Sequence, residues 1–199
     1  MTKSLYISGD IEASGPIPGD YSMLSIGMSV VGHEDDPDMC FYVELKPIPG
    51  AKVNPESMKY VGGLTLEYLE EEGREPAEAM LLLKEWVERV TPDGYVPVFV
   101  AWPAHFDWMW LQWYFIHFLG QSPFGRGSGR AVDIRSFTMG RTGLDYTQGS
   151  KRALRRMGIR SRYRHTHNAL DDAKGQGDLF GQIYERGRRV MRWVANSLR

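Results

Sequence analysis

One eight-residue segment, YVPVFVAW at 95–102, limits the folds open to this chain more than any other. Its length and its β-branched and aromatic content favour a strand, and it is apolar almost throughout. A strand with one face in water alternates apolar and polar residues, so an uninterrupted apolar strand indicates burial on both faces. The chain is therefore expected to form a sheet that is covered on both sides.

Three segments before this strand predict further strands. They read SLYISGDIEASG at 4–15, YSMLSIGMSVVG at 21–32 and MCFYVELKPIPG at 39–50. Their alternation and β-branched residues favour strands, and their short connections favour an antiparallel meander. A fifth, short strand is predicted for AVDIRSF at 131–137.

The sequence also predicts helices, most clearly at 75–90, where apolar residues recur with helical spacing after Pro76. The positions expected on its buried face are Ala79, Leu82, Leu83, Trp86, Val87 and Val90. Further helices are expected at 105–120, 150–159 and 168–195. Strands followed by alternating helices and strands predict an α/β fold, with a mixed sheet flanked by helices in a single domain, 1–199.

The charges are distributed unevenly, although the net charge is −1. Residues 34–78 hold twelve Asp and Glu against four Lys and Arg, whereas residues 126–164 hold eleven Lys and Arg against two Asp. A local basic segment can bind a polyanion, because phosphate contacts are local. The alternative is a solvated basic surface.

The chain has one cysteine, Cys40, and neither an apolar signal core at its start nor an apolar run long enough to span a bilayer. These features predict a cytoplasmic protein without a membrane partner.

Two carboxylates, Asp10 and Glu12, stand at the end of the first predicted strand and point to the same side of it. Like charges so close together are unfavourable unless a cation neutralises them. Small neighbours such as Ala13 leave room for a ligand. A polar strand end that enters a turn is the alternative interpretation of this pattern.

Asp107 and Asp172 each lie in the first turn of a predicted helix. Asp107 stands among aromatic residues and needs a partner for its charge, although a carboxylate at a helix N-terminus is favourable in itself. In the last helix, Asp172 shares the apolar face with Gln176, whereas Asp171 lies about 100° away. We therefore predict that Asp172 points inward and that Asp171 is solvated.

His167 precedes Asp172 by five residues, in the loop that enters the last helix. From there it can lie over a site that contains Asp172. His165 stands beside Arg162 and Arg164 and is expected on the surface.

Together these residues resemble the DEDDh 3′-5′ exonucleases, relatives of proofreading exonuclease domains, ribonuclease T and oligoribonuclease. The resemblance rests on D-x-E at 10–12, F-D at 106–107 and H-x4-D at 167–172, and covers about residues 5–185. It implies a ribonuclease-H-like fold, with a central five-stranded mixed sheet of three antiparallel strands and then two parallel ones. It also implies hydrolysis of phosphodiester bonds from the 3′ end of single-stranded RNA or DNA.

By this resemblance, the site holds two Mg²⁺ or Mn²⁺ ions. Asp10, Glu12 and Asp172 would bind one ion directly, and Asp10 would bind the other, with Asp107 acting through water. His167 would be the general base, because its ordinary pKa of about 6.5 lets it take a proton from water near neutral pH. Hard oxygen ligands suit both cations, which explains carboxylates rather than cysteines.

Substrate contacts are expected beside these residues, at Ala13, Trp102, His105, Phe106, Arg162 and Arg164. Many family members have the sequence H-N-A-x-F-D where this chain has WPAHFD at 102–107. Trp102 and Pro103 replace the histidine and the asparagine, so we expect the substrate to be bound by different contacts here. Trp102 or His105 could stack on a base, which is worth about 1–3 kcal/mol. The alternative for Trp102 is packing under the sheet. The seven basic residues at 151–164 suit the backbone of a single strand.

Two other functions remain as alternatives: a non-catalytic nucleic-acid-binding module and an endonuclease of the same superfamily. Clustered carboxylates argue against the first and His167 against the second. Family members often form homodimers, so a homodimer is an expectation here, although no residue indicates one.

Overall fold

The computed structural model describes residues 2–127 and 129–197, and side chains as far as residue 187. A five-stranded sheet with the strand order β3-β2-β1-β4-β5 forms its centre. The strands are β1 (Lys3–Ala13), β2 (Met23–Val30), β3 (Cys40–Glu44), β4 (Tyr95–Ala101) and β5 (Ala131–Asp133). β2 runs antiparallel to β1 and β3, whereas β4 runs parallel to β1 and β5. The predicted mixed sheet is therefore confirmed.

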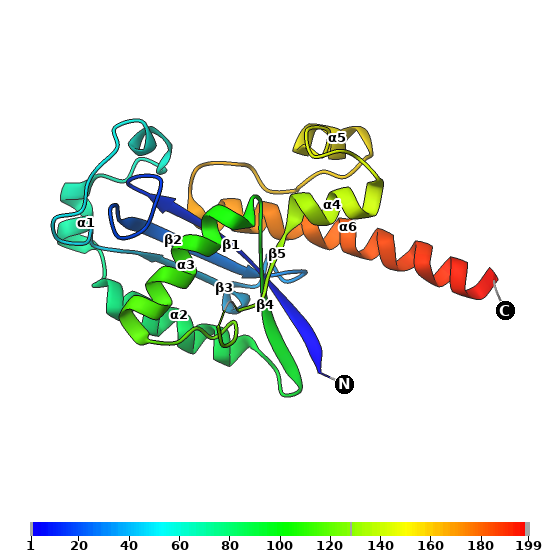
Figure 1. Cartoon of the computed structure of the whole chain (residues 1–199), viewed down its shortest axis with the longest axis horizontal. Helices are drawn as coiled ribbons and strands as arrows, with labels where there is room; N and C mark the ends of the chain where they lie inside the picture. Colours follow the sequence, from blue (N-terminus) through cyan, green and yellow to red (C-terminus); the bar gives the residue numbers. More distant parts are fainter. Residues whose placement is uncertain (1, 128, 198–199) are drawn as a thin grey trace.

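Helices cover both faces of this sheet, and the long α6 crosses one of them (Figure 1). The helices are α1 (Leu66–Glu72), α2 (Pro76–Val90), α3 (Ala104–Leu119), α4 (Ile134–Thr142), α5 (Lys151–Arg156) and α6 (Ala169–Ser197), with short 3₁₀ turns at Pro37–Met39 and Ser57–Tyr60. Among the described residues, no helix has both the length and the apolarity needed to cross a membrane.

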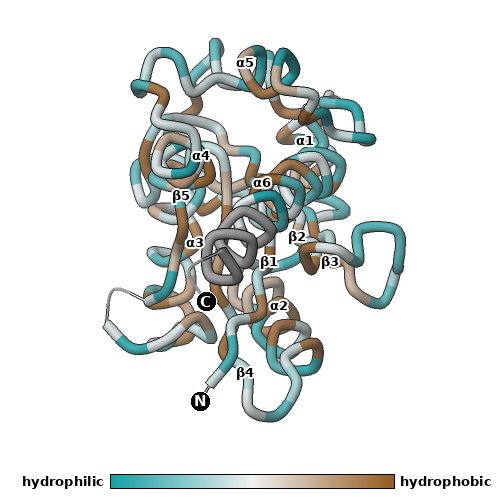
Figure 2. The backbone as a smooth tube through the Cα atoms, turned by 90° about the vertical axis from the view of Figure 1, so that its right-hand side faces the viewer, coloured by the Kyte–Doolittle hydropathy of each residue, from teal (hydrophilic) through white to brown (hydrophobic). Residues whose placement is uncertain are grey.

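Two cores result, one on each face of the sheet. Phe99 of β4 belongs to the core shared with α2 and α3, whereas the next residue, Val100, belongs to the core shared with α4, α5 and α6. Because successive side chains of a strand point to opposite faces, β4 must be apolar at every position. In Figure 2 the hydrophilic segments lie mostly in peripheral loops, which agrees with this layered arrangement.

Two predictions about these elements were wrong in detail. The fifth strand ends at Asp133 rather than at residue 137, because the Asp133 side chain accepts the backbone N–H of Ser136 (2.7 Å) and so caps α4. In α2, Leu82 is 38% exposed, and Met80 is fully buried instead. At 3.6 residues per turn, Met80 lies nearer the centre of the buried face.

Candidate active site

Three carboxylates meet at the carboxyl end of β1. One oxygen each from Asp10, Glu12 and Asp172 lies within 4.8 Å of the other two. Asp10 and Glu12 are two residues apart on β1 and face α6, whose first turn carries Asp172. Glu12 and Asp172 are buried, at 8% and 4% exposure, whereas Asp171 is exposed. The predicted orientation of the two neighbouring aspartates is thus confirmed.

A glycine in β2 allows the first turn of α6 to approach the sheet this closely. Gly27 pairs with Asp10 in the sheet, and a Cβ atom built on it would lie 2.2 Å from the backbone nitrogen of Leu170. Any larger residue at position 27 would push the first turn of α6, and Asp172 with it, away from the carboxylates of β1. The absence of a side chain at Gly27 therefore sets the spacing of the carboxylate cluster.

Asp107 approaches the same cluster from α3. It is 3% exposed, and its Oδ1 accepts the backbone N–H of Ile11, the residue between Asp10 and Glu12, at 3.2 Å. Asp107 is not a member of the group whose oxygens lie within 4.8 Å of one another. Direct ligation by three carboxylates, with Asp107 one layer further out, is compatible with this arrangement.

The cluster carries more negative charge than its protein surroundings balance. Burial, and then the charges of Asp172 and Asp107, raise the pKa of Glu12 to about 9. Burial also raises the pKa of Asp107 to about 7, although the hydrogen bond from Ile11 acts in the opposite direction. The pKa of Asp10 is raised well above its ordinary range by burial and by the neighbouring carboxylates. Hard oxygen donors with unbalanced charge fit a divalent cation.

This electrostatic arrangement predicts how stability depends on pH when no divalent cation is bound. Because the pKa of Glu12 rises from 4.5 to about 9 on folding, the folded protein keeps a proton that the unfolded chain has lost. The contribution of Glu12 is fully present below about pH 4.5 and is lost as the pH rises through about 9. Calorimetry in chelator should therefore give melting temperatures that fall from pH 5 to pH 9.

Millimolar Mg²⁺ or Mn²⁺ should raise the melting temperature most at the alkaline end, where the carboxylates ionise most easily. Glu12→Gln should flatten the profile measured in chelator. A wild-type profile that is already flat, or that rises with pH, would contradict this account of the cluster.

Gln176, one turn after Asp172, holds Asp10 in place. It is 3% exposed; its Nε2 donates to Asp10 Oδ1 (2.5 Å) and its Oε1 accepts the backbone N–H of Trp102 (2.5 Å). Gln176 thus links α6, β1 and the end of β4. The helical pattern placed it on the inward face but gave no sign of its partner, so the sequence analysis missed this role.

We expect Gln176→Ala to lower the affinity for the divalent cation and to leave the protein folded. The substitution frees the Asp10 side chain without removing a carboxylate. Residues that orient metal ligands typically account for about 10–100-fold in metal affinity or activity. The measurement is the divalent-cation concentration that gives half of the maximal rise in melting temperature. Gln182→Ala is the matched control, because Gln182 lies on the same helix and donates to Arg160 O instead. Equal cation requirements in the two variants would count against a positioning role for Gln176.

The loop before α6 is fixed by Asp172 itself. Asp172 Oδ1 accepts the N–H of Thr166 (3.0 Å), and Oδ2 accepts the N–H of His167 (3.2 Å). His167 has a left-handed backbone conformation (φ 59°), and its ring lies 5.4 Å from that of Tyr60. A non-glycine residue in this conformation costs free energy, and such residues concentrate at functional sites.

His165 lies on the surface, as predicted, but it also contacts Asp172, which was not predicted. Its side chain is 61% exposed, yet its Nδ1 lies 2.6 Å from Asp172 Oδ2. The hydrogen bonds that the loop N–H groups donate to Asp172 bring residues 165–167 over the first turn of α6, so both histidines lie beside that carboxylate. The spacing of residues in the sequence does not predict this contact, because it depends on the conformation of the loop.

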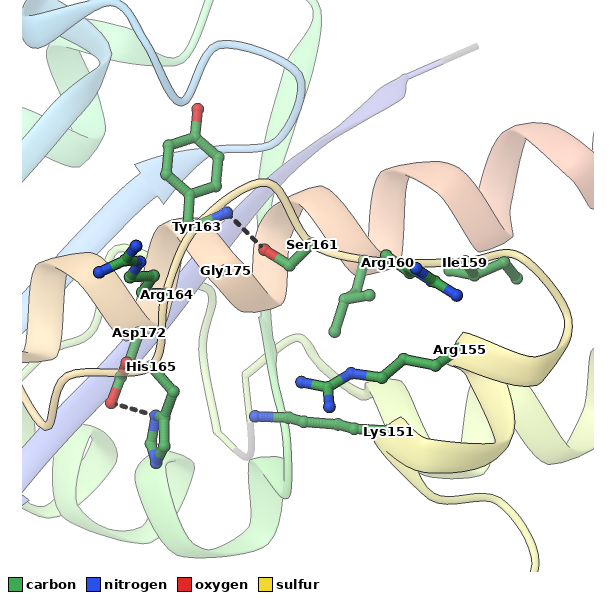
Figure 3. Close-up of a pocket in the computed structure, with 11 residues that line it drawn as sticks. Lys151, Arg155, Ile159, Arg160, Ser161, Tyr163, Arg164, His165, Asp172 and Gly175 are labelled. Carbon is green, nitrogen blue, oxygen red and sulfur yellow. Dashed lines mark hydrogen bonds and ion pairs between the residues drawn. The ribbon is translucent and has the colours of Figure 1, made fainter.

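A cavity of about 390 Å³ opens beside these residues. In Figure 3, Lys151 and Arg155 extend from α5 toward His165, and a dashed line joins the His165 ring to the Asp172 carboxylate beside it. The complete lining is Lys151, Arg155, Ile159, Arg160, Ser161, Tyr163, Arg164, His165, Asp172, Gly175 and Leu179. The cavity therefore places cationic side chains next to a carboxylate of the cluster.

The predicted substrate contacts fall in different places. Arg164 lines this cavity, but Arg162 lies 3.1 Å from Asp35 and is also near Glu34 and Asp178, so carboxylates already balance its charge. Of the other four, Ala13 is buried in the core beneath α2 and α3, and Phe106 packs against it. Trp102 packs against the second core, as in the alternative interpretation, and His105 is exposed.

Comparison with known proteins identifies a relative of nearly the same length. The chain is 38% identical over 181 residues to the 3′-5′ DNA exonuclease Cap18 of Escherichia coli, which covers 91% of this chain and 92% of that protein. No protein-family model matches the chain.

Solved structures of exonucleases share the fold. E. coli exonuclease I in complex with a dT13 oligonucleotide superposes with a TM-score of 0.66 at 13% identity, over 96% of this chain and 43% of that one. S. pombe Pop2p, in its Mg²⁺- and Mn²⁺-bound form, gives a TM-score of 0.63 at 16% identity, over 91% and 83%. The chain thus spans less than half the length of exonuclease I, and the predicted ribonuclease-H-like fold is confirmed.

Proposed function

The chain belongs to the family of 3′-5′ exonucleases that includes Cap18 of E. coli, and on this premise we propose that it removes nucleotides from the 3′ end of single-stranded DNA in a divalent-metal-dependent reaction. The observation that carries the proposal is the meeting of Asp10, Glu12 and Asp172 within 4.8 Å beside a cationic cavity. A protein that only binds nucleic acid gains nothing from clustered negative charge that faces phosphate.

The donor set fits Mg²⁺ or Mn²⁺. Asp10, Glu12 and Asp172 would hold one cation directly, and Asp10 with the more distant Asp107 would hold a second. When bound, the cations supply positive charge to the attacking and leaving oxygens of the phosphodiester. Gln176 would keep Asp10 in the orientation that both cations need, through its hydrogen bond to Asp10 Oδ1.

The general base in this proposal is His167. It takes a proton from the water that attacks the terminal phosphodiester, and the bond from phosphorus to the 3′-oxygen of the preceding nucleotide breaks. The products are a nucleoside 5′-monophosphate and a strand shortened by one residue with a free 3′-hydroxyl. The fixed backbone of the loop supports this role, because it keeps the imidazole beside Asp172.

The cationic lining of the cavity would bind the substrate backbone. Lys151, Arg155 and Arg164 line it without an opposing carboxylate among the ion pairs of the described residues, unlike Arg162. We propose DNA rather than RNA because the similar protein Cap18 is a DNA exonuclease. Action on RNA, a homodimeric state and a cytoplasmic location stay predictions.

The test is degradation of 5′-labelled single-stranded DNA and RNA side by side, in Mg²⁺, in Mn²⁺ and in chelator. We expect a ladder of shortened 5′-labelled DNA products that depends on the cation, together with released mononucleotides. A circular single strand distinguishes the alternatives, because an endonuclease cuts it and an exonuclease does not. Binding of linear DNA without turnover under every condition would favour the non-catalytic module.

A further inference from the structure

We propose that His165, His167 and Asp172 form a separate cation site, which takes Zn²⁺ and thereby inhibits the exonuclease. The site itself stands on the geometry of these three residues, and the inhibition rests on the proposed function. It would be distinct from the carboxylate cluster in its donor atoms, although the two share Asp172.

The three side chains converge closely enough to hold one ion. One nitrogen from each histidine and one oxygen from Asp172 lie within 4.8 Å of one another. The two imidazole centroids are 4.4 Å apart with a tilt of 59°, so the rings do not stack face to face. Figure 3 shows the His165 ring beside the Asp172 carboxylate; both residues line the cavity, and the His165 side chain is 61% exposed to solvent.

The chemistry of the donors separates the two sites. Asp10, Glu12 and Asp172 offer oxygen atoms alone, which suit Mg²⁺ and Mn²⁺. Two imidazoles and one carboxylate are a set that Zn²⁺ accepts, with three protein ligands and a fourth position left open. Divalent ions late in the first transition series bind nitrogen donors more tightly than Mg²⁺ does. The histidine site would therefore favour Zn²⁺ over the Mg²⁺ or Mn²⁺ of the carboxylate cluster.

The backbone around the site is already arranged for this geometry. Asp172 is fixed by two N–H groups of the loop, and the carbonyl of His167 lies against Gly62, where a Cβ atom would come within 2.3 Å. Gly62 itself has φ 64°, a conformation that suits glycine. The ring of Tyr60 supports the imidazole of His167 from the same segment. The contact between His165 Nδ1 and Asp172 Oδ2, now 2.6 Å, has to widen to admit an ion, while the backbone of the loop can stay in place.

Positively charged side chains near the site influence which ligand can occupy the fourth coordination position of the ion. Lys151, Arg155 and Arg164 line the same cavity and oppose a bare dication, so binding must come from the three ligands. The same cations favour an anion, such as inorganic phosphate, as the fourth ligand of a bound Zn²⁺. Phosphate should therefore strengthen zinc binding.

Occupation of this site would stop hydrolysis for two reasons. It ties up the nitrogen with which His167 accepts a proton in the proposed reaction. It also draws Asp172 away from the cation held with Asp10 and Glu12. Micromolar Zn²⁺ should then inhibit the reaction even when Mg²⁺ is present at millimolar concentration.

The experiment measures Zn²⁺ binding by titration calorimetry on the full chain, with Zn²⁺ alone and then with millimolar Mg²⁺ present. We expect His165→Ala to weaken binding at least about tenfold, as loss of one of three ligands should, whereas the surface variant His33→Ala binds like the wild type. Circular dichroism checks that both variants fold. Nitrogen-15 spectra of the histidine rings should change at His165 and His167 together when Zn²⁺ is added.

The proposal is overturned if His165→Ala binds Zn²⁺ as tightly as the wild type, or if the ring nitrogens do not respond. For the activity readout, each variant is compared with itself with and without Zn²⁺, so its basal rate does not matter. Zinc binding without nuclease activity under any condition would contradict the proposed function and leave the zinc site standing. Nuclease activity without zinc binding at the histidines would contradict the zinc site and leave the proposed function standing.

Discussion

Replacement of Asp172 with asparagine is expected to lower the exonuclease rate by about 10³-fold or more. Metal ions contribute several kcal/mol of charge stabilisation to such reactions, and each 1.36 kcal/mol corresponds to a factor of ten in rate. Asp172 belongs to the oxygen cluster with Asp10 and Glu12 and also holds the loop that carries His167. The substitution removes a negative ligand and puts an amide N–H₂ near backbone donors, so it disturbs both features.

Asp171→Asn is the matched control, because the same change is made one residue away. Asp171 is exposed, and its Oδ2 accepts the hydroxyl of Thr166 at 2.9 Å, on the outer side of the helix. Single-turnover rates at saturating substrate should stay within a few-fold of the wild type. An inactive Asp171→Asn together with an active Asp172→Asn would exchange the roles of the two residues and refute the arrangement proposed for the site.

Periodicity accounts for what the sequence predicted well. The uninterrupted apolar run of β4 required helices on both faces of the sheet, and the structure places Phe99 and Val100 in opposite cores. The 100° step of a helix likewise separated Asp172 from Asp171. Both inferences depend only on the direction in which a side chain leaves its own strand or helix, which is a local property.

Contacts between distant segments were harder to predict. Gln176 was placed on the correct face, but its bond to Asp10 joins residues 166 positions apart. Arg162 stands in the most basic stretch, yet it pairs with Asp35, 127 residues earlier. His165 reaches Asp172 because the loop backbone folds onto that carboxylate. A long, flexible side chain has many partners within reach, and only the assembled fold selects among them.

The fifth strand was overextended for a related reason. Its β-branched residues and Phe137 favour a strand, but Asp133 is followed three residues later by Ser136, whose N–H it accepts. An aspartate in this position is a sequence signal for a helix start. Capping competes with strand propensity, and here the cap ended the strand after three residues.

His167→Ala is expected to reduce turnover by about 10²–10⁴-fold, the usual range for a general base. The reduction should appear in the single-turnover rate at saturating DNA and not mainly in binding, because the proposed role is proton removal from water. Wild-type rates should rise between pH 6 and pH 9, because a general base accepts a proton only when it is not already protonated. In His167→Ala this rise should disappear, and the residual rate should increase only as hydroxide becomes available.

The measurement compares wild type, His167→Ala, His165→Ala and His33→Ala from pH 6 to pH 9, with chelator-treated buffers so that stray Zn²⁺ does not interfere. His33 lies in an exposed turn after β2 and serves as the surface control. His165→Ala should lower the rate far less than His167→Ala, although it is the His165 imidazole that lies 2.6 Å from Asp172. The proposed cation would also need Asp172, so binding of the cation would compete with the contact to His165, whereas the proposed role of His167 does not depend on that contact. If His165→Ala instead abolishes the pH-dependent rise and His167→Ala keeps it, then His165 is the base and the H-x4-D pattern assigns the wrong histidine.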